Sequence, residues 1–383
     1  MKKDIRQFNF LKLIFFMRYF ADSLFYAFTA TYLFDMGLKE GLIGNIQSIT
    51  TITCLIVNPI WTYFARNNKT SIILLIILSI LEGGFIILYG MTDYVLLIMI
   101  ITSLMATVAG PYYNLLDGYT ITFCEEKGFE YSNVRVIGSL AYVFGTVVGG
   151  VLIKYIGYEY VFMISGILFM ISGLSTKFLK NVGQVAQHKK ANLSKIIINK
   201  SLYFYILMYI LVVTMGIVSD NFISVMLKNV RGFTTTEYSF VYSAMVIVEV
   251  IVLVILGKLF KRAKYINLLL FAGVMYALRS FIISLESVPT PILIFGCMLR
   301  GIAWGTVLFV HIKYLTKLVG LENITSAAIF VSVLTNLVQF IVSNFFGYVI
   351  EYQGYSFTYK IVGIVALIAS VCYYFVIRIK ENL

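Results

Sequence analysis

Charged residues are scarce in this 383-residue chain. Asp, Glu, Lys and Arg make up 13% of it, against roughly 25% in a soluble globular domain. Apolar residues make up 60%, and the mean hydropathy is +0.91. This shortage of charge excludes an ordinary soluble protein, and the composition indicates an integral membrane protein.

Cysteine and histidine are also rare. The four cysteines are scattered without metal-ligand spacing or evident pairing, so we interpret them as small packing residues and expect no metal site and no cofactor. His188 and His311 have no clear acidic or nucleophilic companion. A membrane-embedded enzyme such as an acyltransferase needs such a group, and we therefore expect no enzymatic activity.

Long apolar runs fill most of the chain. A spanning helix needs about 20 mostly apolar residues, and the length allows roughly twelve of them. The runs are too continuous for transmembrane β-strands, which alternate over about ten residues. We predict an all-α polytopic membrane protein with twelve transmembrane helices. The predicted spans are 10–34, 41–64, 70–91, 94–122, 134–156, 158–179, 201–227, 237–257, 265–285, 289–316, 323–349 and 355–378.

The net charge of +12 is unevenly distributed. Counting alternate loops, about twenty Lys and Arg fall on the side of the membrane that holds the N-terminus and about five on the other side. This asymmetry follows the positive-inside rule and places both termini in the cytoplasm. We expect a bacterial cytoplasmic membrane protein whose basic loops face anionic lipid headgroups rather than nucleic acid.

A short pattern occurs once in each half of the chain. Gly150-Val-Leu-Ile-Lys-Tyr-Ile-Gly-Tyr158 returns as Gly347-Tyr-Val-Ile-Glu-Tyr-Gln-Gly-Tyr355. A weaker echo at almost the same offset aligns Thr62, Arg66 and Lys69 with Gly257, Lys261 and Lys264. The two echoes indicate duplication. We predict pseudo-symmetric six-helix bundles over 1–180 and 201–383, joined by a cytoplasmic loop over 181–200.

Nine ionisable residues inside the predicted spans are the informative ones. Each costs about 2.5–3.5 kcal/mol at the centre of a spanning helix unless it is paired or solvated. We therefore expect these charged side chains to face a protein interior or a water-filled pathway. A membrane anchor or a scaffold has no need of so many, so their number argues against both. They are Asp22, Glu82, Asp117, Asp220, Glu249, Arg18, Arg135, Arg279 and Arg300.

Asp117, Arg135 and Tyr142 form the first candidate binding site. Asp117 lies near the end of the fourth span and Arg135 near the start of the fifth, with Tyr142 two turns further on the same helix face. An arginine fork, an accepting carboxylate and an aromatic ring suit a hydroxyl-rich ligand such as a sugar. The alternative is an inter-helix ion pair with a packing tyrosine.

Two features of the first half concern helix contacts. Arg18 and Asp22 are four residues apart and can pair on one helix face, either to fix packing or as part of the pathway. Glu82 precedes Gly83-Gly84, where a close helix contact can shield it, so we favour a structural role. The fifth span offers further close approaches at Gly138, Gly145 and Gly149.

Five acids against four bases leave one carboxylate without a full partner. A desolvated, unpaired carboxylate binds a proton readily, as proton coupling requires. Glu249 is the first candidate and Asp220 the second, with Arg279 and Arg300 balancing charge. The alternative is an acid that stays protonated, and Na⁺ is an alternative coupling ion because carboxylates bind either.

The segment from Ala109 to Gly145 resembles the major facilitator superfamily, and within it the lactose-permease-like group of proton-linked sugar symporters. The match is carried by Glu130-Tyr-Ser-Asn-Val-Arg135-Val-Ile-Gly-Ser-Leu-Ala-Tyr142. The resemblance implies that Asp117 and Arg135 bind sugar and that Tyr142 stacks on it. It also matches family positions in the second half at Asp220, Arg279 and Lys313-Tyr314.

The chain departs from the family pattern in several places. The sugar-binding acid is Asp rather than Glu, and the ring is Tyr rather than Trp. The loop signature after the second span lacks its Asp. Arg300 and Ala303 occupy the positions of the family's proton-handling His and Glu. A sugar-type pocket is thus better supported than the family's own proton route.

We therefore expect a secondary active transporter that works as a monomer by alternating access, with its substrate near the bilayer midplane. The favoured function is proton-coupled uptake (symport) of a small polar solute such as a sugar, glycoside or nucleoside. The alternatives are an efflux carrier for drugs or metabolites, a flippase for saccharide-linked lipids, or a non-transporting sensor.

Overall fold

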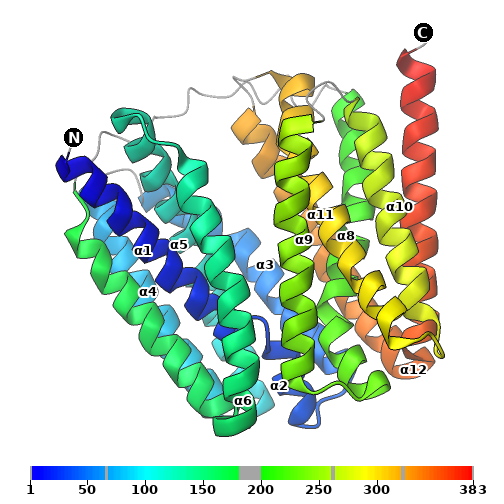
Figure 1. The fold of residues 1–383 in the computed structure, drawn as a ribbon, viewed down its shortest axis with the longest axis horizontal. Helices are drawn as coiled ribbons and strands as arrows, with labels where there is room; N and C mark the ends of the chain where they lie inside the picture. Colours follow the sequence, from blue (N-terminus) through cyan, green and yellow to red (C-terminus); the bar gives the residue numbers. More distant parts are fainter. Residues whose placement is uncertain (1, 65–67, 181–199, 260–263, 321–323, 382–383) are drawn as a thin grey trace. The chain divides into compact units, whose positions relative to one another are not determined.

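The computed structural model describes residues 2–64, 68–180, 200–259, 264–320 and 324–381, and no strand occurs in these ranges (Figure 1). The prediction of an all-α protein is confirmed. The helices are α1 (Lys2–Phe25), α2 (Thr29–Asp35), α3 (Glu40–Phe64), α4 (Asn68–Gly90), α5 (Val95–Lys127), α6 (Tyr131–Ser175), the short η1 (Thr176–Phe178), α8 (Lys200–Arg231), α9 (Thr235–Leu259), α10 (Tyr265–Ser284), α11 (Thr290–Val319) and α12 (Ile324–Glu381).

The helix count is consistent with twelve spans. Nine helices within the described ranges are long and apolar enough to cross a membrane. Two of the nine, α6 and α12, each contain two helices joined at a bend. Helix α1 is not among the nine, because Lys12, Arg18 and Asp22 lower its hydropathy. Splitting α6 and α12 and adding α1 gives the predicted number.

The bends in α6 and α12 fall at the repeated sequence pattern. Gly157 has φ 80° and ψ 172°, and Gly354 has φ 81° and ψ 171°. This backbone region is open almost only to glycine. The tyrosine after each bend then donates a hydrogen bond to an acid between the first two predicted spans. The repeated sequence pattern therefore forms the same glycine bend and the same tyrosine–acid hydrogen bond in both halves of the chain, which supports duplication.

By its internal contacts the chain divides into two compact units. Unit 1 comprises Met1–Leu38, Ile46–Gln187 and Leu227–Ser243, and unit 2 comprises Lys39–Asn45, His188–Met226 and Ala244–Leu383. Most of each predicted bundle falls in one unit, while 39–45 and 227–243 group with the other. The predicted central loop, apart from Lys200, lies outside the described residues, as do Arg66, Lys261 and His188.

Glycines of α6 admit α1 at close range in unit 1, and Figure 1 shows α1, in dark blue, running along α6. A Cβ on Gly138 would lie 2.7 Å from Cδ2 of Tyr19, and one on Gly149 would lie 3.1 Å from Cδ2 of Leu24. The predicted close approach is confirmed. This packing leaves another face of α1, which carries Arg18, directed at α4 and α5.

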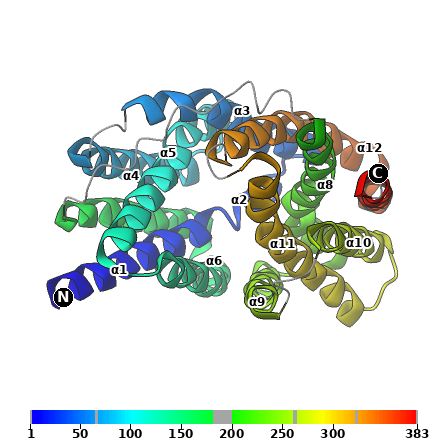
Figure 2. The ribbon, with the colours of Figure 1, turned by 90° about the horizontal axis from the view of Figure 1, so that it is seen from above.

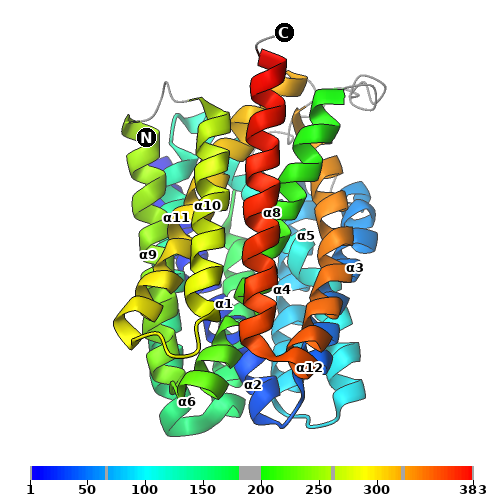
Figure 3. The same cartoon turned by 90° about the vertical axis from the view of Figure 1, so that its right-hand side faces the viewer.

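Both units have apolar cores. Unit 1 buries Phe15, Leu78 and Tyr112 among α1, α4 and α5. Unit 2 buries a comparable cluster around Tyr205 of α8 and Tyr373 of α12. Figure 2 shows α10 beside α11, and Figure 3 shows the C-terminal part of α12, in red, beside α8 and α10. Charged side chains inside such cores need specific partners.

Candidate functional site

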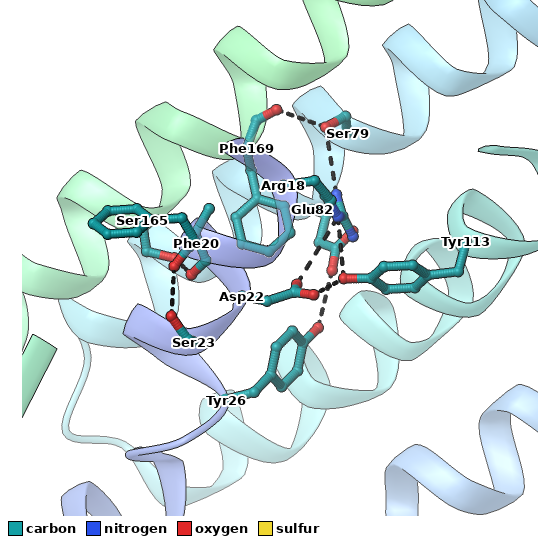
Figure 4. A network of polar contacts seen from close by, with 11 residues as sticks. Arg18, Phe20, Asp22, Ser23, Tyr26, Ser79, Glu82, Tyr113, Ser165 and Phe169 are labelled. Atoms are coloured by element: carbon teal, nitrogen blue, oxygen red, sulfur yellow. Dashed lines mark hydrogen bonds and ion pairs between the residues drawn. The ribbon is translucent and has the colours of Figure 1, made fainter. Parts of the chain in front are cut away.

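A buried ion cluster lies among α1, α4 and α5 of unit 1 (Figure 4). Arg18 and Glu82 are both fully buried, and Nη2 of Arg18 lies 2.5 Å from Oε2 of Glu82. Nε of Arg18 lies 3.9 Å from Oδ1 of Asp22, four residues along the same helix. The predicted pairing of Arg18 with Asp22 is present, but Glu82 is the nearer partner.

Two tyrosines complete the polar contacts of this cluster. The Tyr113 hydroxyl accepts a hydrogen bond from Nε of Arg18 at 3.2 Å and donates one to Oδ2 of Asp22. The Tyr26 hydroxyl donates to Oε1 of Glu82 at 2.9 Å. Glu82 therefore accepts two hydrogen bonds. Oδ1 of Asp22 is buried and accepts none from the described residues.

Aromatic rings cover the faces of the Arg18 guanidinium. Its central carbon lies 3.9 Å from the ring centre of Tyr112, 4.7 Å from that of Tyr113 and 4.1 Å from that of Phe169. Guanidinium groups stack favourably on aromatic faces. Arg18 is thus held rigidly on several sides, with one positive charge facing two carboxylates.

Asp117, Arg135 and Tyr142 all lie in unit 1 and are half-buried. Asp117 of α5 accepts a hydrogen bond from the Tyr131 hydroxyl at 2.8 Å. No ion pair joins Arg135 to Asp117 or to any other carboxylate in the described part of the chain. Arg135 instead donates to Ser139 at 3.5 Å. The inter-helix ion pair offered as an alternative is therefore not formed.

The Tyr19 ring connects Arg135 to the buried cluster. The Arg135 guanidinium carbon lies 4.7 Å from the centre of that ring, and the Tyr19 and Tyr113 rings are 5.6 Å apart. Tyr113 in turn holds Asp22. A continuous set of side chains therefore leads from the predicted ligand-binding arginine to the predicted charge network.

Unit 2 contains a balanced chain of charges. Asp220 lies 2.7 Å from Nη2 of Arg279 and 2.9 Å from Nε of Arg300, and Nη1 of Arg300 lies 2.5 Å from Oε2 of Glu249. A Cβ on Gly301 would lie 2.8 Å from the backbone nitrogen of Glu249. This glycine brings α11 close to α9 and so places Arg300 beside Glu249.

The described ion pairs place the excess carboxylate in unit 1, whereas the sequence count favoured a residue of unit 2. The sequence count favoured Glu249 as the carboxylate without a full partner, yet Glu249 and Asp220 face two arginines in unit 2. In unit 1, Arg18 alone faces both Asp22 and Glu82. The surplus negative charge among the described ion pairs therefore lies in unit 1.

His311 was a weaker candidate from sequence. Its Nδ1 lies 2.8 Å from the Tyr205 hydroxyl, and its ring stacks on Tyr209 at 4.3 Å between centres. These contacts tie His311 into the aromatic core of unit 2. It contacts none of the charged residues discussed above.

Sequence reasoning missed the tyrosines that complete these sites. Tyr26 follows Asp22 and Arg18 at intervals of four, so the helical spacing alone indicates that it shares their face. Tyr113 carries no such signal, because its partners lie on other helices.

A further polar group in unit 1 went unpredicted as well. Asp35 pairs with Lys228 and accepts a hydrogen bond from Tyr158 at 2.8 Å, in a recess of ≈ 540 Å³ also lined by Lys154. In unit 2, Tyr355 donates to Glu40 at 2.7 Å. The matching tyrosines of the repeated pattern were the available signal.

The family model described as Major Facilitator Superfamily matches residues 11–343. The chain belongs to the major facilitator superfamily. The expected family resemblance is confirmed, and this member of the superfamily is a polytopic membrane transporter for small molecules.

Solved structures of other transporters share the fold. A mutant of the nucleoside transporter NupG superposes with a TM-score of 0.85 at 14% identity, covering 95% of this chain and 98% of that one. A bacterial homolog of the human lysosomal transporter Spinster superposes with a TM-score of 0.73 at 13% identity, covering 97% and 96%. Identities this low show a shared fold alone and carry no information about the substrate.

Two relatives are detected by sequence. The maltose permease of Geobacillus stearothermophilus is 24% identical over 151 residues, which cover 39% of this chain and 38% of that protein. The probable 3-phenylpropionic acid transporter of Escherichia coli (strain K12) is 21% identical over 363 residues, covering 93% and 94%. This superfamily transporter thus has distant relatives whose named substrates differ chemically.

Proposed function

We propose that this superfamily transporter takes up a small polar solute, a sugar, glycoside or nucleoside, together with protons across a bacterial cytoplasmic membrane. The observation that carries the proposal is the state of Arg135. This arginine is half-buried inside a membrane-spanning helix and is not neutralised by a carboxylate of the described residues. A charge in that position is costly unless a ligand or water meets it.

The neighbours of Arg135 suit a hydroxyl-rich ligand. Asp117 offers an acceptor that only the Tyr131 hydroxyl engages among the described residues. Tyr19 and Tyr142 offer rings for an apolar sugar face or a nucleobase. Arg135 donates in a fork that matches paired hydroxyls. We therefore assign substrate binding to Asp117, Arg135 and Tyr142.

The buried charges support coupling to an ion. A passive pore or carrier has no need of the paired acids and arginines that both units hold. Glu249 and Asp220, balanced by Arg300 and Arg279, are the coupling residues favoured by sequence. If Na⁺ rather than a proton is the coupling ion, replacing sodium in the assay buffer would abolish accumulation of the solute.

The experiment is uptake by proteoliposomes with an imposed proton gradient. The panel is maltose, lactose, uridine, adenosine and 3-phenylpropionate, each radiolabelled. We expect accumulation of a sugar or nucleoside that collapses when a protonophore is added. Accumulation of none of the four polar solutes, or accumulation unaffected by the protonophore and by sodium, would refute the proposal.

Variants test the site within the same assay. We expect Asp117→Asn and Arg135→Ala to abolish uptake while each protein remains inserted and monodisperse. Asp93→Asn and Arg6→Ala are matched controls, because both residues are exposed and neither makes a described contact with Asp117, Arg135 or Tyr142. Wild-type transport in the two site variants would remove them from the binding site. Accumulation only in inside-out vesicles would replace uptake by export.

A further inference from the structure

The buried ion cluster of unit 1 contains more acidic than basic side chains. Arg18 and Glu82 are 0% exposed and Asp22 is 5% exposed, so one buried guanidinium faces two buried carboxylates. A buried charge without compensation is strongly disfavoured, and such a carboxyl group neutralises itself by binding a proton. One of the two acids is therefore suited to hold a removable proton.

The hydrogen bonds distinguish the two acids. Glu82 accepts from Arg18 at 2.5 Å and from Tyr26 at 2.9 Å, so both of its oxygens are engaged. Asp22 accepts from Tyr113 at Oδ2, while its buried Oδ1 accepts no hydrogen bond from the described residues. A proton on Oδ1 would remove the surplus charge and leave the Tyr113 bond in place.

The surroundings couple this acid to the binding residues. The charged groups that act on Asp22 are Arg18 of its own helix, Glu82 of α4 and Arg135 of α6. The titratable groups near the cluster are Tyr19 on α1, Tyr26 in the turn after α1, Cys54 on α3, Tyr112 and Tyr113 on α5, and Tyr142 on α6.

We propose that Asp22 carries the exchangeable proton of this transporter. The assignment rests on the proposed function, since it gives that function its coupling residue in place of Glu249 or Asp220. On loading, the Asp22 carboxylate and one proton from the outer solution form an O–H bond at Oδ1. On release the bond breaks and the proton leaves to the cytoplasm, so one proton crosses per cycle and nothing is oxidised or reduced.

The test reads the proton directly and needs no substrate. Infrared difference spectra of the purified protein, recorded between about pH 5 and pH 9, report the C=O stretch of a protonated carboxyl group. We expect the wild type to show one buried carboxyl band that titrates in this range. Asp22→Asn should lose the band, and Glu249→Gln should keep it.

Two further variants keep the test decisive if Asp22→Asn misfolds. Asp22→Glu retains a carboxyl group and should keep the band at a shifted frequency. Tyr113→Phe should shift the frequency of the band, because the Asp22 carboxyl group loses its hydrogen bond from the Tyr113 hydroxyl. A band that persists in Asp22→Asn, or that disappears only in Glu249→Gln, would overturn the assignment.

Uptake measurements separate this inference from the proposed function. In the proteoliposome assay, Asp22→Asn should exchange labelled maltose or uridine across the membrane but should not accumulate it. Proton-driven accumulation by the Asp22→Asn variant would refute the assignment of the proton to Asp22 and would leave the proposed function intact. Loss of the infrared band in Asp22→Asn, with no uptake of any panel solute by the wild type, would support the assignment and refute the proposed function.

Discussion

Arg18 and Arg300 each bind two carboxylates from within a membrane-spanning helix. Arg18 holds Glu82 and Asp22, and Arg300 holds Asp220 and Glu249. The planar guanidinium presents donors in several directions, which a lysine ammonium does not do in a fixed fork. Removing one partner of a buried pair leaves the other charge uncompensated, so at the residue scale these pairs are sensitive points.

Glu82→Gln should destabilise the protein by about 1–3 kcal/mol, because Arg18 and Tyr26 lose their hydrogen bonds to a carboxylate and Arg18 keeps only the longer contact with Asp22. Thermal unfolding in detergent measures the change. The control is Glu159→Gln, since Glu159 is exposed. Equal unfolding temperatures for the two variants would contradict a structural role for Glu82.

Arg300→Met should also destabilise the protein, since it removes the ion pairs of Arg300 with Glu249 and with Asp220. Adding Glu249→Gln should restore part of the loss. The double-mutant cycle should give a coupling energy of about 0.5–3 kcal/mol, as for residues in direct contact. Strictly additive effects would show that the 2.5 Å contact contributes nothing to stability.

Helices in this protein are shaped by glycine in two distinct ways. Gly157 and Gly354 supply backbone conformations that join two spans within one continuous element. Gly83 supplies close approach, since a Cβ there would press against the Gly166 carbonyl oxygen of α6. At the element scale these two roles give different expectations for the same Gly→Ala substitution.

Gly157→Ala and Gly354→Ala should each lower stability by about 1–3 kcal/mol, the cost of forcing alanine into a glycine-only conformation. No atom lies within 4 Å of a Cβ built at either position, so steric contact does not confound the result. Gly118→Ala is the matched control, because it is equally free of contacts and helical. If Gly157→Ala, Gly354→Ala and Gly118→Ala all unfold at the same temperature, then an alanine side chain does not strain the backbone at the two bends.

Gly83→Ala should weaken the contact of α4 with α6 by about 1–3 kcal/mol through overpacking. A Cβ at Gly83 would lie 2.9 Å from Cγ of Met170, whereas the nearest atom to a Cβ at Gly84 is 3.8 Å away. Gly84→Ala should therefore be tolerated. Thermal unfolding compares the adjacent variants, and greater loss in Gly84→Ala would contradict the packing.

The distribution of basic residues governs the molecule as a whole. About twenty Lys and Arg in alternate loops, against about five in the others, predict which loops face the cytoplasm. The structure ends α4 at Gly90, one residue before the predicted end of the third span at 91, and ends α5 at Lys127, five residues beyond the predicted end of the fourth span at 122. Orientation in the membrane remains a prediction from charge.

Alkaline phosphatase fusions test this orientation, because the enzyme is active only outside the cytoplasm. Fusions after Asp93 and Glu286 should be active, and those after Gly128 and Lys264 inactive. Green fluorescent protein at the same four positions should give the opposite pattern. Activity after Gly128 or Lys264 would reverse the predicted topology.

Much of the fold was predictable from sequence, and less of the site. The spans follow from local composition. The pairing of Arg18 with Asp22 follows from helical spacing. The stronger partner Glu82 lies 64 residues away, and Asp220 lies 80 residues from Arg300. Such pairings depend on how helices rotate against each other, which apolar runs do not specify.

The sequence by itself determined that this chain is a helical membrane protein, because the length of an apolar run and the burial of charge are local properties of the chain. The repeated glycine pattern indicated duplication, and the structure then showed that two helices bend at its glycines, Gly157 and Gly354. Only the tertiary structure decided which acid each arginine neutralises, and hence that the surplus carboxylate lies beside Arg18 rather than at Glu249. The physical reason is that charge compensation is set by distances of a few ångströms between side chains far apart in sequence.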